Sequence, residues 1–243
     1  MIDSEGVWYF KTAYGIELDE SYRDLTEEMA CQLNSKALDF YFKHITTVKM
    51  GGYYEYRSQY VEKLPCITED GADRFAMMRE RAGEIVDAID LDGKTDRFPE
   101  AYLGEYDGEL DFLTYEWQTR RYPVDAMIEE TTDGEFTVGA GRSDTITDPA
   151  MYADDRAARK RRAEYVHAAV DGRNVTSGAE TTVPIPRSDS GVGELLDRLD
   201  ADREAVARTD IDALEAAIDA AVYDLFALTD EERAAVEEHL DVF

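Results

Sequence analysis

Two linked stretches near the N-terminus decide how this chain is interpreted: residues 33–43 read LNSKALDFYFK, and residues 51–65 read GGYYEYRSQYVEKLP. Residues 31–66 contain five basic and three acidic side chains, whereas the whole chain has a net charge of −29. Seven aromatic residues lie among these cations. This mixture suits a polyanion that carries bases, because cations meet phosphates while rings and polar tips meet sugars and base edges. The same aromatic residues would equally suit a hydrophobic core, and composition alone does not separate the two interpretations.

The spacing of apolar residues around this window predicts its local structure. One helix is expected from Thr26, which can cap it, to about Thr47. Residues 49–52 are then typical of a turn, and residues 53–64 are predicted as an aromatic-rich extended stretch.

In such a strand, alternate side chains point to opposite faces. Tyr53, Arg57 and Gln59 would share one face, which we assign to DNA or to a catalytic partner. Tyr60 would lie on the other face, which we assign to the core.

The rest of the chain predicts an α+β fold, with a mixed α/β body over residues 1–180 and a helical C-terminal segment over residues 190–243. The body is expected to contain a second helix over 71–90, strands over 111–118, 122–128 and 135–139, a helix over 151–170 and an edge strand over 181–186. Three helices are expected in the C-terminal segment, over 191–208, 210–227 and 230–240, where apolar residues recur at helical spacing.

The composition of the 243 residues points to an origin in concentrated salt. The chain has 55 acidic and 26 basic residues, and only seven of the basic residues are lysines. An acidic, lysine-poor surface is typical of a halophilic protein, and we expect a haloarchaeal source. The alternative is an ordinary, very soluble acidic domain. Disorder is excluded by the 44% hydrophobic content.

Two further features bear on localisation. No apolar run approaches the roughly 18 residues needed to span a membrane, and the first residues do not resemble a signal peptide. Cys31 and Cys66 are far apart in the sequence and are expected to be reduced. We therefore expect a cytoplasmic protein.

No catalytic centre is predicted. All six prolines are isolated, so the Pro-Pro tetrapeptide of amino-group methyltransferases is missing. Gly191-Val192-Gly193 lacks the third glycine of a nucleotide loop. Asp90, Asp92 and Lys94 faintly resemble a nuclease site, although an Asp-Gly turn after a helix explains them equally well.

The order of residues in the window resembles a known pattern. A helix with Leu33-Asn34-Ser35-Lys36, a Gly51-Gly52 turn and an aromatic, basic stretch ending in Leu64-Pro65 are similar to the C-terminal specificity (target-recognition) domain of TaqI-like adenine-N6 DNA methyltransferases and type IIG restriction-modification enzymes. Residues 221–232, AVYDLFALTDEE, resemble the terminal helix pair of that family. In this segment Thr229 is expected to be an N-cap with Glu232 at the capping-box position.

This resemblance implies that the chain recognises a double-stranded DNA sequence for methyl transfer to adenine N6, with the base flipped out of the duplex. The catalytic domain of the family is not in this sequence, so S-adenosylmethionine is expected on a methyltransferase or restriction partner domain or subunit, and no cofactor or metal in this chain. The residues expected to contact DNA are Asn34, Ser35, Lys36, Lys49, Gly51, Gly52, Tyr53, Tyr54, Tyr56, Arg57, Gln59 and Lys63.

A second basic cluster, at residues 156–162, adds Arg159 and Arg162 to the expected DNA contacts. Its alternative interpretation is a solvated helix whose cations pair with nearby carboxylates. For the whole chain, the alternatives to DNA recognition are a protein-interaction or regulatory subunit that does not bind DNA and, less favoured, a nuclease.

Overall fold

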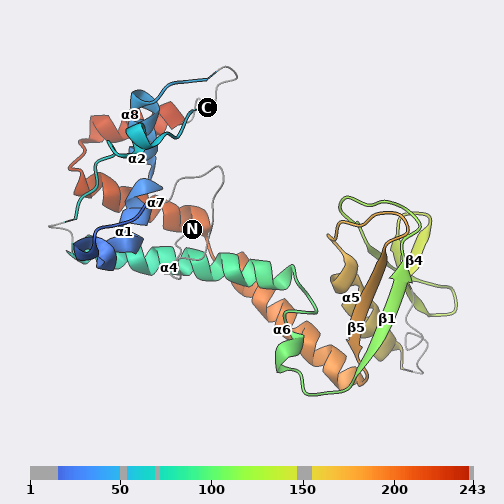
Figure 1. The fold of residues 1–243 in the computed structure, drawn as a ribbon. Coiled ribbons are helices and arrows are strands. Elements are labelled where there is room, and N and C mark those ends of the chain that lie inside the picture. Colours follow the sequence, from blue (N-terminus) through green and yellow to red (C-terminus); the bar gives the residue numbers. More distant parts are fainter. Residues whose placement is uncertain (1–15, 50–53, 69–71, 147–154, 241–243) are drawn as a thin grey trace. The chain divides into compact units, whose positions relative to one another are not determined.

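The computed structural model describes residues 16–49, 54–68, 72–146 and 155–240. It confirms an α+β fold with small antiparallel sheets and a helical C-terminal region. The chain divides into two compact units (Figure 1). The first consists of Met1–Asp87 and Thr209–Phe243, and the second of Ala88–Arg208.

The first unit is helical in the part of the chain that the structure describes. Its elements are η1 (Glu20–Leu25), α1 (Thr26–Leu33), α2 (Lys36–Ile45), α3 (Ser58–Val61), most of α4 (Ala72–Thr95), α7 (Ile211–Leu225) and α8 (Asp230–Leu240). Residues from both ends of the chain share one core, in which Met78 and Val222 are fully buried beside Cys31 and Val236. The two sequence-distant halves of this unit therefore form one structure.

The second unit holds the two sheets. Strands β1 (Leu110–Glu116) and β5 (Glu180–Pro186) pair antiparallel, and β2 (Met127–Glu130), β3 (Phe136–Ala140) and β4 (Asp144–Ile146) form an antiparallel sheet in that order. The helical elements are η2 (Leu103–Glu105), α5 (Arg156–Val170) and α6 (Asp189–Arg208). The core includes Trp117, Tyr165, Val138 and Leu195, all fully buried.

This division corrects the predicted domain boundary. A border between residues 180 and 190 would separate β5 from α6, but both pack into the core of the second unit through Val183, Ile185, Val192 and Leu195. The C-terminal helices are likewise shared, because α6 belongs to the second unit and α7 and α8 to the first.

Two local predictions in the N-terminal window are wrong. The single helix predicted from Thr26 to Thr47 is two helices, broken at Asn34–Ser35. The strand predicted over 53–64 is reduced, within the described residues 54–64, to one bridge between Val48 and Tyr54, followed by the short α3. The assignment of alternate side chains to two strand faces therefore does not apply.

Two observations relate to the predicted location of the protein: the state of its cysteines and the apolar character of its helices. Cys31 and Cys66 are free thiols, and burial raises the pKa of Cys31 to about 11. Among the described residues there is no helix that combines the length and the apolar character needed to cross a membrane.

Candidate nucleic-acid interface

The junction between α1 and α2 holds three of the residues predicted to contact DNA. The Asn34 side-chain amide donates to the carbonyl of Ala30 (2.7 Å), which closes the last turn of α1. The Ser35 hydroxyl donates to the carbonyl of Gln32 (2.6 Å) and accepts from the N–H of Leu38 (3.4 Å), so it ends one helix and caps the next. Because Ser35 is only 2% exposed, its role is structural.

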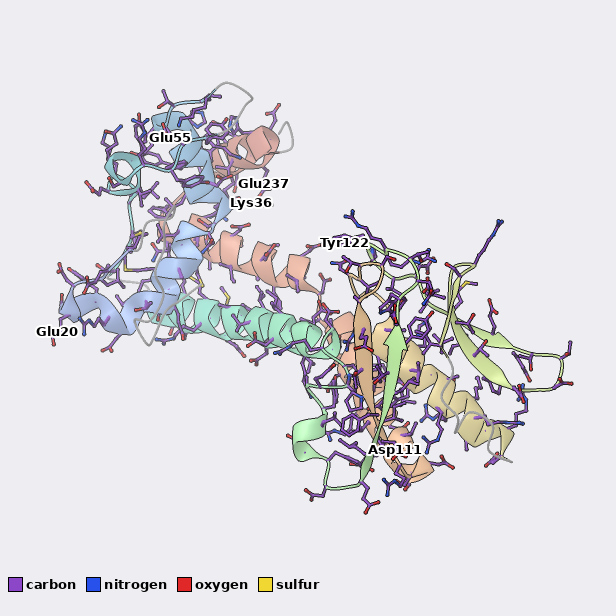
Figure 2. The ribbon with its side chains drawn as sticks, turned by 45° about the vertical axis from the view of Figure 1, so that its right-hand side comes forward. Glu20, Lys36, Glu55, Asp111, Tyr122 and Glu237 are labelled. Atoms are coloured by element: carbon purple, nitrogen blue, oxygen red, sulfur yellow. The ribbon has the colours of Figure 1, made fainter. Side chains whose placement is uncertain are left out.

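Lys36, the third of these residues, connects the junction to the C-terminal helices. Its backbone N–H donates to Oδ1 of Asp219 on α7 (2.9 Å), and its Nζ lies 2.7 Å from Oε2 of Glu237 on α8. Tyr223 donates to the other carboxylate oxygen of Glu237 (2.7 Å). Figure 2 shows Lys36 and Glu237 side by side. The hydrogen bond from Lys36 holds the pKa of Glu237 below its usual range.

Glu55 binds both of the cations that follow α2. Its carboxylate lies 2.5 Å from Nζ of Lys49 and 2.7 Å from Nε of Arg57. The hydrogen bond from Lys49 lowers the pKa of Glu55, and Arg57 adds to this effect. The side chains of Lys49 and Arg57 remain 57% and 53% exposed. These two cations thus share a carboxylate at the surface, with which a phosphate would have to compete.

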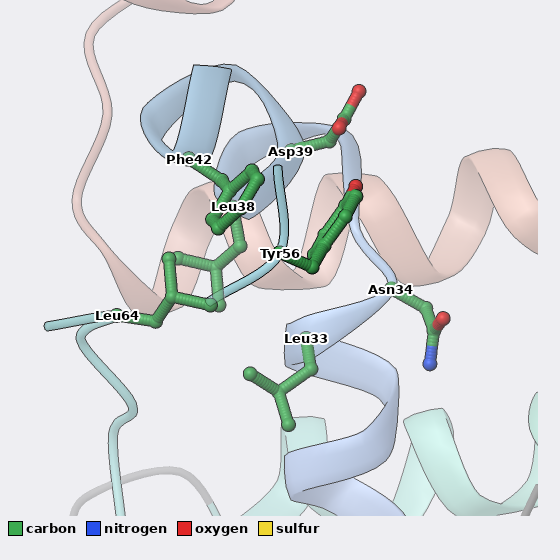
Figure 3. Close-up of a pocket in the computed structure, with 7 residues that line it drawn as sticks. All are labelled: Leu33, Asn34, Leu38, Asp39, Phe42, Tyr56 and Leu64. Carbon is green, nitrogen blue, oxygen red and sulfur yellow. The ribbon is translucent and has the colours of Figure 1, made fainter. Parts of the chain in front are cut away.

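Tyr56 stacks on Phe42 of α2, with ring centroids 4.2 Å apart and planes inclined by 11°. The pair borders a pocket of about 160 Å³ (Figure 3), which is lined by Leu33, Asn34, Leu38, Asp39, Phe42, Tyr56 and Leu64. Tyr56 is nevertheless 60% exposed. The pocket thus brings residues of both stretches, 33–43 and 51–65, to one place on the surface.

The remaining residues of the window lie around α3 or outside the described residues. Lys43 approaches the ring of Tyr54 (5.7 Å to the centroid), and Lys63 approaches the ring of Tyr60 (5.9 Å). Gln59 is exposed on α3. Gly51, Gly52 and Tyr53, with the predicted turn to which the glycines belong, lie outside the described residues.

The basic cluster on α5 is mostly neutralised by carboxylates, as its alternative interpretation requires. Arg162 is 4% exposed; its Nε donates to Asp189 (2.9 Å) and its Nη2 to the carbonyl of Arg187 (2.7 Å). Because Arg162 is buried and its guanidinium group is held by these hydrogen bonds, it is a structural residue rather than a phosphate contact. Arg159 is half-buried, with a buried Nε that has no hydrogen-bond partner in the described chain.

The nuclease hypothesis finds no support in the described residues. Lys94 is bound to Asp202 (2.7 Å) and lies over the ring of Tyr102 (4.4 Å to the centroid). Asp90 and Asp92 lie within α4, not in a turn. Over the described ranges, no three His, Cys, Asp or Glu side chains lie close enough together to hold a metal ion.

Sequence reasoning missed the carboxylates that organise this site: Glu55, Asp219 and Glu237. Glu55 carried a local signal, because it lies two residues before Arg57. Asp219 and Glu237 carried none, since they lie about two hundred residues from Lys36 in the sequence. No family model matches the chain, and no curated protein or solved structure shows significant similarity to it.

Proposed function

We propose that this chain is a sequence-specific DNA-recognition module of an adenine-N6 DNA methyltransferase or restriction-modification system, and that it acts with a separate catalytic domain or subunit. That partner would bind S-adenosylmethionine and transfer the methyl group to a base flipped out of the duplex. This chain would supply the choice of DNA sequence.

One observation carries the proposal: the two motifs that resemble the methyltransferase family meet in one unit. The Leu33–Lys36 segment contacts the helix that contains Tyr223 through the Lys36–Asp219 hydrogen bond, and the helix that follows it through the Lys36–Glu237 ion pair. Tyr223 itself donates to Glu237. Contacts of this kind are expected if the motifs belong to one domain and not to unrelated segments that resemble the family by chance.

A second function, a protein-interaction subunit without DNA binding, is favoured by the charge balance at Glu55. Lys49 and Arg57 already have a carboxylate partner, and so do Lys36 and Lys43. A surface of paired charges with an exposed Tyr56 also suits the polar, aromatic contacts of a protein interface.

Replacing Glu55 separates these two functions. If Lys49 and Arg57 contact DNA, Glu55→Gln should strengthen binding, because it removes a negative charge and releases both cations. Arg57→Ala should weaken binding by roughly 1–3 kcal/mol if the guanidinium contacts a base. Binding is measured by fluorescence anisotropy on duplexes that the wild-type chain enriches from a random-sequence pool, and on single-mismatch versions of them.

Glu84→Gln is the matched control, because Glu84 is also a surface partner of an arginine in the first unit, Arg81 (2.7 Å). It removes the same charge away from the site and should change DNA binding much less than Glu55→Gln. Failure of the wild-type chain to enrich any duplex would contradict the proposal. Equal effects of the two Gln variants would show that Lys49 and Arg57 do not contact DNA.

A further inference from the structure

Two eight-residue loops of the second unit contain no carboxylate, although nearly a quarter of the chain is Asp or Glu. Residues 117–124 follow β1, and residues 172–179 precede β5. Since β1 and β5 are antiparallel, the two loops lie at the same end of the strand pair. A third acid-free loop, residues 141–143, connects β3 to β4. Together these loops contain four arginines.

Backbone hydrogen bonds hold the two longer loops against each other. Arg121 and Val175 exchange both of their backbone hydrogen bonds (3.0 Å each). On either side, the N–H of Gly178 donates to Trp117 (2.8 Å) and that of Val124 to Arg173 (2.8 Å). The loops therefore form one ordered surface.

The carboxylate of Asp144 ties the third loop to the first. It is 0% exposed and accepts from the N–H of Gln118 (2.8 Å), the hydroxyl of Thr119 (2.5 Å) and Nη2 of Arg121 (3.4 Å). Burial opposes its ionisation, but these hydrogen bonds outweigh burial and lower the pKa of Asp144. The carboxylate therefore holds the loops together from inside the protein and is not itself exposed at the surface.

Gly141 leaves room for the guanidinium group of Arg121 to lie over the third loop. The φ of Gly141 is +68°, and a Cβ added there would lie 2.5 Å from Nη2 of Arg121. This Nη2 donates to the carbonyl of Ala140 (2.6 Å). A side chain at this position would both strain the backbone and displace the guanidinium.

Two cations and one aromatic ring face outward from this surface. Tyr122 is 68% exposed, and the Arg120 guanidinium lies 5.3 Å from its ring centroid. Figure 2 shows Tyr122 beyond the arrowhead of β1. Arg142 is exposed as well. Neither Arg120 nor Arg142 forms an ion pair with a described residue, in contrast to Arg187, Arg198 and Arg208 of the same unit, which pair with carboxylates.

We propose that residues 117–124, 141–143 and 172–179 form a second DNA-contacting surface, in which Arg120 and Arg142 bind phosphates and Tyr122 packs against the sugar or base beside them. The proposal rests on the proposed function and extends it to the second unit. Duplex DNA is the partner that charge complementarity favours: in a chain of net charge −29, the three loops contain no Asp or Glu, and they combine an exposed ring with two exposed guanidinium groups that form no ion pair with a described residue.

The test compares two double variants of the full chain. Arg120→Ala/Arg142→Ala removes the two outward cations. Arg156→Ala/Arg208→Ala is the matched control, because it removes two exposed arginines of the same unit that pair with Glu130 and Glu204. Circular dichroism in the assay buffer checks that both are folded. Binding to a labelled 30-base-pair random-sequence duplex is then measured between roughly 0.2 and 1 M KCl.

Two lost phosphate contacts should reduce the log–log salt slope by about 1.8 and weaken binding about tenfold near 0.3 M KCl. The control should retain the wild-type slope. As a second measurement, photo-crosslinking to a bromodeoxyuridine-substituted duplex should label the peptide that contains Tyr122.

The outcomes distinguish this inference from the proposed function. Wild-type chain that binds no duplex would overturn both. DNA binding that is the same in the two double variants would overturn only this surface. This surface would also be overturned if Arg120→Ala/Arg142→Ala kept its affinity for DNA but no longer bound a methyltransferase subunit, because the surface would then be a protein interface.

Discussion

At the scale of single residues, carboxylates determine what most cations of the first unit can do. Lys36 is held by Glu237, and Lys49 and Arg57 are held by Glu55. Asp219 acts differently, since it accepts the backbone N–H of Lys36 at the first turn of α2. It is an N-terminal cap supplied by another helix, placed where the helix dipole favours a negative charge.

Replacing Asp219 tests whether this cap stabilises the folded chain. Asp219→Ala should cost about 1 kcal/mol, as for the loss of a cap, whereas Asp219→Asn keeps an oxygen acceptor and should cost less. Burial raises the pKa of Asp219, so the folded state binds this proton more tightly than the unfolded state. The stability contributed by this group is therefore present at low pH and is lost as pH rises through the raised pKa.

Urea unfolding between pH 4 and 7 at constant KCl concentration checks this, with wild type measured alongside both variants. The free energy of unfolding of the Asp219→Asn variant should increase relative to that of wild type as pH rises. An Asn variant as unstable as the Ala variant at every pH would show that Asp219 does not cap α2.

At the scale of elements, the start of α8 shows how local chemistry defines a helix end. The N–H of Thr229 donates to Glu232 (2.8 Å), and the N–H of Glu232 donates to the Thr229 hydroxyl (3.3 Å). This reciprocal pair is the capping box that the sequence predicts. The hydrogen bond from the Thr229 backbone lowers the pKa of Glu232. Helix α8 then contributes Val236 to the core of the first unit.

Thr229→Ala should destabilise the chain by about 1 kcal/mol, because the N–H of Glu232 loses its acceptor. Thr229→Ser keeps the hydroxyl and should remain close to wild type. Thermal unfolding in high KCl measures both variants. Identical melting temperatures for the Ala and Ser variants would indicate that the capping box does not stabilise α8.

At the scale of the whole molecule, 55 carboxylates against 26 basic groups make self-repulsion the dominant long-range force. Salt shortens the screening length from about 10 Å at 0.1 M to about 3 Å at 1 M. Close pairs such as Lys36–Glu237 are screened much less than distant like charges. Added salt should therefore favour the folded state.

We expect the melting temperature to rise between about 0.1 and 2 M KCl. Sucrose of equal osmolality is the control, because it favours compact states by exclusion from the surface but does not screen charge. A melting temperature that does not rise with KCl, or that rises equally in sucrose, would contradict stabilisation by charge screening.

Local interactions explain why much of the fold could be predicted from the sequence. The positions of α4 to α8, the β1 and β5 strands and the capping box at Thr229 follow from periodicity and from contacts within a few residues. The α+β class follows from these elements. The predicted DNA contacts at Asn34 and Tyr56 came instead from the resemblance to the methyltransferase family, and both residues line the pocket on α2.

The tertiary structure alone decided where α1 ends, which segments share a core and which cations are paired. The break at Ser35 is stabilised by Asp219 from the far end of the chain. In place of the predicted strand, residues 54–64 hold Glu55 between two cations, Tyr56 stacked on Phe42 and the short α3. Asp144 likewise joins loops about 25 residues apart. Only the Glu55 pairs had a local signal, since Arg57 lies two residues from Glu55. The contacts of Asp219 and Asp144 connect residues far apart in the sequence, so no local pattern could reveal them.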